Sequence, residues 1–135
     1  MTVRPSDPPP RRFPAALRQR AASFGHAWRG VAAAWRSEVH LRLHGLATVA
    51  VVALGFYCRL GRLEWALVTL AVGLVWSLEL VNTAVEAVVN LVSPEYHPLA
   101  GKVKDMAAGA VLTAAIGAAV VGLIVFGERV LGLFE

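Results

Sequence analysis

The sequence predicts an all-α membrane protein with three transmembrane helices, preceded by an amphipathic helix that lies in the membrane interface. Hydrophobic residues make up 57% of the 135 positions and charged residues only 16%. Charged residues account for about 25% of an average soluble domain. Three apolar runs follow one another, each close to the ~20 residues that a membrane span requires. Polar residues gather before and between these runs.

The net charge of +4 raises the possibility of a nucleic-acid partner. Eight of the thirteen basic residues, however, precede the first apolar run. A basic arm beside a membrane segment is typical of a topology and anionic-lipid signal. We therefore expect a membrane, and no nucleic acid, as the partner. The single cysteine, Cys58, has no second cysteine to pair with and says nothing about the compartment.

The first 42 residues divide into a tail and a helix. Residues 1–14 hold five prolines and three arginines with little to bury, so we expect a disordered tail. We expect no signal peptide, because the apolar region starts late and follows many arginines. Over about 15–42, Phe24, Trp28 and Trp35 recur at helical spacings opposite arginines. This pattern predicts the interfacial amphipathic helix.

The three spans are expected at about 43–60, 65–92 and 104–127. A tight turn over 59–64 separates the first two, and a loop with two prolines follows the second. The third span is rich in alanine and glycine, which favours close helix packing or oligomerisation. The domain containing these spans is expected to cover 15–135.

Positive charge predicts the orientation of the spans. The N-terminal arm and the loop with Lys102 and Lys104 should lie inside the cell, and the 59–64 turn outside. The N-terminus is then cytoplasmic and the C-terminus is not. The far end of the second span consequently meets the cytoplasm, where ATP and Mg²⁺ are available.

The second span carries a polar stripe. An ionisable side chain at the bilayer centre costs roughly 3 kcal/mol, so such residues usually face a protein interior or a polar cavity. At about 100° per residue, five polar residues of this span share one helical face: Glu79, Asn82, Thr83, Glu86 and Asn90. Apolar residues cover the rest of the helix. The stripe therefore predicts a site turned away from lipid.

An intramembrane acidic stripe is compatible with an ion or proton relay, a counter-charge for a partner, or catalysis on a lipid. A relay needs polar groups through the full depth, whereas here they gather at the cytoplasmic edge. Glu38, Lys104 and Asp105 join the stripe there. Carboxylates beside a lysine suit Mg²⁺ and phosphate chemistry. The sequence has no Walker A motif, so a nucleotide site must be built in another way.

The polar residues fall into short motifs: Trp28-Arg29-Gly30, Glu79-x-x-Asn82-Thr83-Ala84-x-Glu86, Glu95-Tyr96-His97-x-Leu99 and Lys104-Asp105-x-Ala107-Ala108-Gly109. Together they resemble the prokaryotic diacylglycerol kinase family, which includes undecaprenol kinases, over about residues 22–128. The resemblance implies a small three-span kinase of the bacterial inner membrane that forms a homotrimeric bundle. It also implies that MgATP phosphorylates a lipid hydroxyl at the cytoplasmic interface.

The resemblance also implies roles for individual residues. Glu79 matches the general base, and Glu38 and Glu86 match the acids that bind Mg²⁺. Four further residues match or adjoin the ATP site: Asn82, Lys104, Asp105 and Arg29. Asn90 stands where the family commonly has Asp, so one negative charge near the metal is missing.

We therefore expect a lipid kinase that phosphorylates undecaprenol, with diacylglycerol as the alternative acceptor. Trp35 and Trp76 are expected beside Glu79 at the lipid, although Trp35 could simply anchor at the interface and Trp76 could simply pack. Three spans offer little surface to enclose a nucleotide and a lipid together, so we expect sites completed between subunits. The alternative from another class is a non-enzymatic membrane interaction protein whose acidic stripe binds a cation or a basic helix.

Overall fold

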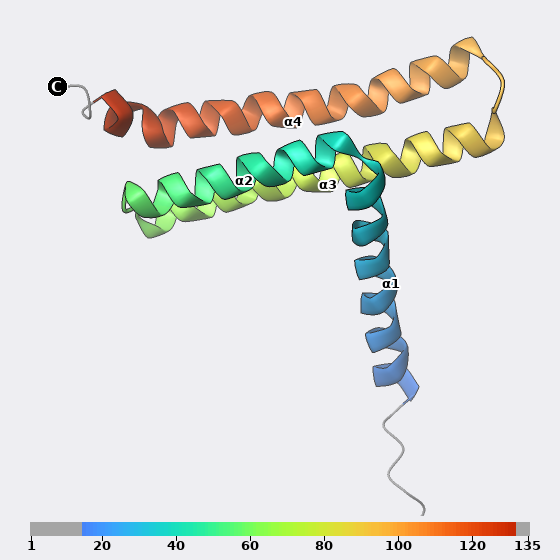
Figure 1. Cartoon of the computed structure of the whole chain (residues 1–135), viewed down its shortest axis with the longest axis horizontal. Coiled ribbons are helices and arrows are strands. Elements are labelled where there is room, and N and C mark those ends of the chain that lie inside the picture. The colour runs from blue at the N-terminus through green and yellow to red at the C-terminus, as the bar shows by residue number, and fades with distance from the viewer. Residues whose placement is uncertain (1–14, 132–135) are drawn as a thin grey trace, which may run out of the picture. The chain divides into compact units, whose positions relative to one another are not determined.

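The computed structural model describes residues 15–131, so the tail expected at 1–14 lies outside the described residues. The described chain forms four helices and no strand: α1 (Ala15–Ser37), α2 (Val39–Tyr57), α3 (Arg62–Val92) and α4 (Pro98–Leu131) (Figure 1). The predicted all-α fold is confirmed. The chain divides into two compact units, Met1–Ala33 and Ala34–Glu135.

The described part of the first unit is the helix α1 up to Ala33. Its aromatic side chains Phe24 and Trp28 are largely exposed. Arg29 is also exposed and its Nη2 donates a hydrogen bond to Nδ1 of His26 (3.1 Å). Exposed aromatic rings beside basic side chains are the composition of a helix that lies on a membrane surface.

The helix expected over 15–42 ends earlier, at Ser37. Glu38 adopts an extended conformation (φ −99°, ψ 120°), and α2 begins at the next residue. The Glu38 amide still donates to the carbonyl oxygen of Ala34 (2.8 Å), which closes the last turn of α1. The apolar spacing of the sequence continues across this break to Leu41, so the pattern does not reveal the break. Leu41 is fully buried. Residues 39–42 consequently form the first turn of the first span.

Three helices are long and apolar enough to cross a membrane: Val39–Tyr57, Arg62–Val92 and Pro98–Gly127. This confirms the predicted number of spans. α3 contacts both α2 and α4, and the chain reverses between each pair (Figure 1). After α2, Arg59 has a left-handed backbone (φ 52°), and the Leu60 amide donates to the Gly55 carbonyl oxygen (3.1 Å). A bond of this kind ends a helix in a tight reversal.

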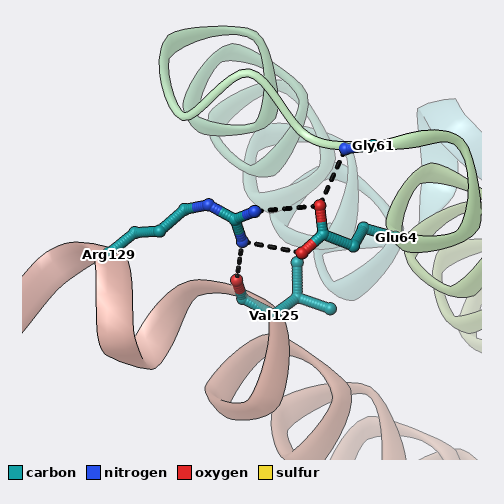
Figure 2. Close-up of polar contacts among 4 residues, drawn as sticks. All are labelled: Gly61, Glu64, Val125 and Arg129. Carbon is teal, nitrogen blue, oxygen red and sulfur yellow. Dashed lines mark hydrogen bonds and ion pairs between the residues drawn. The ribbon is translucent and has the colours of Figure 1, made fainter.

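The turn end of the bundle is held by a buried cluster and an ion pair. Four residues form the cluster: Leu60, Val68, Val125 and Phe126. Beside it, Arg129 of α4 binds Glu64 of α3 with two hydrogen bonds of 2.7 and 3.0 Å (Figure 2). Glu64 also accepts from the Gly61 amide (2.7 Å), and Arg129 donates to the Val125 carbonyl oxygen (2.6 Å). Glu79 lies 15 residues further along α3, or about 22 Å at 1.5 Å per residue.

Candidate functional site

A cavity of about 230 Å³ lies between α2, α3 and α4. We call it the acidic cavity. Its lining residues come from all three helices: His40, His44, Glu79, Asn82, Glu86, Ala108 and Val111. The structure therefore brings together three residues of the predicted stripe, one helical turn apart along α3. The i, i+4 spacing of the two histidines places both on the same face of α2.

Glu79 is the deepest acidic group of this cavity. Only 4% of the Glu79 surface is exposed, and no other charged side chain among the described residues is buried. Among the side chains that the structure describes, none donates a hydrogen bond to its carboxylate. A buried carboxylate is costly unless it is paired or hydrogen-bonded. The Glu79 carboxylate is therefore available to a partner that enters the cavity from outside the chain.

Asn82 and Glu86 supply further oxygen atoms to the cavity. The Asn82 Nδ2 donates to Oε1 of Glu86 (3.2 Å). The Asn82 Oδ1 is buried and, within the described range, accepts no hydrogen bond. An unpaired amide oxygen next to carboxylates is a donor set that suits Mg²⁺. No group of three His, Cys, Asp or Glu residues among those described could hold a metal alone. The remaining ligands of a bound Mg²⁺ would therefore be phosphate and water oxygens.

Four of the residues predicted to bind the metal or ATP are not among those that line this cavity. Glu38 is half-buried at the break between α1 and α2. Lys104 is half-buried and donates to Oδ1 of Asn90 (2.7 Å), and Asp105 is exposed. Arg29 belongs to the first unit and contacts His26.

The two tryptophans predicted at the lipid form a pair. Their rings stack with centroids 5.8 Å apart and planes inclined by 11°. Trp76 also donates from Nε1 to the Thr48 hydroxyl (3.0 Å). Trp76 also lines a second cavity of about 250 Å³, the apolar slot, whose lining includes Thr48, Val72 and Gly122. His44 lines both cavities, so the apolar slot and the acidic cavity adjoin at this residue.

The sequence prediction missed His40 and His44 as cavity residues. A signal was present, because the two histidines are separated by one helical turn in an apolar segment. This signal is weak by itself, since interfacial histidines are common at the ends of spans. Only the position of α2 against α3 makes it informative.

These features define a small helical membrane protein whose acidic stripe lines a cavity between its three spanning helices, beside an apolar slot. Residues 25–126 match the family described as prokaryotic diacylglycerol kinase. The chain belongs to this family, as the motifs of the sequence predicted.

Three relatives show the extent of the similarity. The chain is 42% identical over 104 residues to undecaprenol kinase of Bacillus subtilis (strain 168), covering 77% of this chain and 85% of the relative. It is 46% identical over 101 residues to diacylglycerol kinase of Synechocystis sp., covering 74% and 58%. It is 38% identical over 96 residues to diacylglycerol kinase of Escherichia coli (strain K12), covering 71% and 79%.

Proposed function

We propose that this protein is a lipid kinase that transfers the γ-phosphoryl group of ATP to the hydroxyl of undecaprenol at the membrane surface. Membership of the diacylglycerol kinase family supports the lipid kinase activity and ATP as the donor. The observation that carries the site is the buried Glu79 carboxylate, which lacks a donor among the described side chains and lies beside Asn82 and Glu86.

Glu79 acts as the general base in the proposed reaction. Its carboxylate accepts the proton of the lipid hydroxyl, whose oxygen then forms a bond to the γ-phosphorus as the bond to ADP breaks. Phosphoryl transfer depends mainly on positioning and on stabilising charge. Glu86 and Glu38 would hold Mg²⁺, which would neutralise phosphate charge. Asn82 orients Glu86 through its amide hydrogen bond.

We assign Lys104 and Asp105, which lie near the acidic cavity, to the binding of ATP. Arg29 of the first unit is assigned to ATP from the family resemblance alone. Lys104 and Asp105 lie in the second turn of α4, about one turn before Ala108, which lines the cavity. A lysine balances phosphate charge as a compact positive group.

The acceptor is undecaprenol, with diacylglycerol as the second candidate. The relative named undecaprenol kinase supports the first choice, because the alignment covers 85% of its length at 42% identity. The two relatives named diacylglycerol kinase support the alternative. In either case the part of the lipid chain next to the hydroxyl occupies the apolar slot beside Trp76, with Trp35 stacked behind it, and the hydroxyl passes His44 to reach Glu79.

The active enzyme is a homotrimer whose sites lie between subunits. Two observations support this assembly. Glu38, Lys104 and Asp105 do not line the cavity of the single chain. In addition, a groove of about 590 Å³ between α3 and α4, distinct from the apolar slot, is lined partly by small residues such as Ala110, Ala114 and Gly117. Small residues allow close helix approach. The enzyme resides in the bacterial inner membrane, with its N-terminus and active site cytoplasmic.

A competition assay tests the function. The purified protein in detergent receives γ-labelled MgATP and equal amounts of undecaprenol and diacylglycerol. We expect the label in one or both lipids, with more in undecaprenol than in diacylglycerol. The Glu79→Gln variant should label neither lipid. Failure to label either lipid while a known relative succeeds in parallel contradicts the activity. Preferential labelling of diacylglycerol contradicts only the choice of acceptor.

A further inference from the structure

Asn90 and Lys104 form a contact that joins α3 to α4 next to the acidic cavity. The Lys104 Nζ donates to Oδ1 of Asn90 at 2.7 Å. Among the carboxylates whose side chains the structure describes, none forms an ion pair with Lys104. The partner of this lysine is therefore a neutral amide, although an acidic residue, Glu86, lies one turn away on the same face of α3.

Helix geometry places the contact at the rim of the cavity. Asn90 follows Glu86 by four residues on α3, and Lys104 precedes Ala108 by four on α4. Four residues advance a helix by about 6 Å. Glu86 and Ala108 both line the cavity. The contact between Asn90 and Lys104 thus joins α3 and α4 one turn beyond the cavity, toward the connection between these two helices.

We propose that Asn90 is a positioning residue that holds Lys104 for the triphosphate of ATP and leaves the positive charge of the lysine unneutralised. This inference rests on the proposed function, because it takes ATP as the ligand of the cavity. An amide oxygen fixes an ammonium group by a charge-assisted hydrogen bond without cancelling its charge. A carboxylate at position 90 would fix the lysine but also neutralise it.

The charge argument separates two roles for position 90. If residue 90 served the metal, a neutral amide would weaken Mg²⁺ binding and a carboxylate would strengthen it. If residue 90 serves Lys104, the amide retains a full positive charge for the phosphates. The observed contact runs to the lysine. The phosphate-directed role is therefore the one that the structure supports.

The test compares binding of ATP and AMP by the full-length protein in detergent, measured by calorimetry. Asn90→Ala and Lys104→Ala should each weaken ATP binding about tenfold, the size expected for a hydrogen bond to a charged group. AMP affinity and the KM for lipid should not change. The double variant should be no weaker than Lys104→Ala, because Asn90 acts through that lysine.

Asn90→Asp distinguishes positioning from charge. It keeps a hydrogen-bond acceptor and adds a negative charge, so ATP should bind several-fold more weakly than to the original protein at low salt. The salt dependence of ATP binding should also be reduced. Lys102→Ala is the matched control, since Lys102 is an exposed lysine two residues from Lys104 without a contact to Asn90 in the described structure. Its ATP affinity should stay within about twofold of the original.

Three results would overturn the inference: unchanged ATP affinity in Asn90→Ala, equal losses for ATP and AMP, or tighter ATP binding in Asn90→Asp. A thermal transition measured for each variant identifies losses due to misfolding. If the original protein phosphorylates lipid but Asn90→Ala binds ATP equally well, only the proposed role of Asn90 is contradicted. An original protein that binds no ATP contradicts the proposed function, and the inference with it.

Discussion

Trp35 stacks on Trp76, with ring centroids 5.8 Å apart, and so joins the start of the second unit to the middle of α3. Trp35 precedes Glu38 by three residues, and Trp76 precedes Glu79 by three. Gly45 of α2 lies against both rings, since a Cβ atom there would collide with Trp35 and touch Trp76. The stack therefore links the segment that carries one proposed metal ligand to the helix that carries the proposed base.

Gly45→Leu should disturb this arrangement. A side chain at position 45 has no room unless Trp35 leaves Trp76, and overpacking of this kind costs about 1–3 kcal/mol. We expect a lower thermal transition in detergent and a higher KM for lipid. Gly73→Ala is the control, because a Cβ there meets nothing within 4 Å. A Gly45→Leu protein as stable and active as the original would contradict the packing argument.

Glu79→Gln should abolish phosphorylation. The amide keeps the shape of the side chain but cannot take the proton of the lipid hydroxyl, and the loss of a general base reduces rates about 10²- to 10⁴-fold. ATP affinity should be retained, since the proposed role of Glu79 is in the chemical step. The exposed loop residue Glu95, changed to Gln, gives a control with the same loss of charge. A fully active Glu79→Gln enzyme would remove Glu79 as the base.

Glu86→Gln should raise the Mg²⁺ concentration needed for half-maximal activity by about tenfold or more, since even supporting residues of metal sites contribute that much. The measurement is a Mg²⁺ titration of activity at saturating ATP. Excess Mg²⁺ should restore part of the rate in this variant but none in Glu79→Gln. An unchanged Mg²⁺ titration would instead restrict Glu86 to its hydrogen bond with Asn82.

Removing the Glu64–Arg129 pair should lower stability and leave the chemistry intact. The pair is bidentate, but its side chains are 30% and 37% exposed, so solvent screening should keep the coupling small. A double-mutant cycle with Glu64→Gln and Arg129→Met, followed by thermal unfolding, measures this coupling directly. The KM for ATP should be unchanged in all three variants. A large change in ATP binding would show that the turn end of the bundle communicates with the cavity.

Most of the fold could be predicted from the sequence because apolar length and charge determine where spans can form. The stripe of Glu79, Asn82 and Glu86 was also predictable, since helical periodicity alone places these side chains on one face. The structure brings them into one cavity.

Other features depended on packing between helices, which the sequence pattern does not encode. The break at Glu38 interrupts a continuous apolar spacing and is visible only in the backbone angles. The histidines of α2 line the cavity only because α2 lies against α3. The partner of Lys104 also depends on tertiary contact, because Asn90 lies 14 residues earlier on another helix.

The acidic lining of the cavity has a further consequence, for the step after transfer. The acceptor enters as a neutral alcohol, but a phosphate monoester carries about −1.5 to −2 charges at pH 7. At a separation of 4 Å and an effective dielectric constant of 20, two unit charges interact by about 4 kcal/mol. Once the metal and ADP have left and Glu79 has released the proton that it accepted, the product headgroup is therefore repelled by the Glu79 and Glu86 carboxylates. The cavity admits an uncharged substrate and repels the anionic product, so product inhibition should be weak.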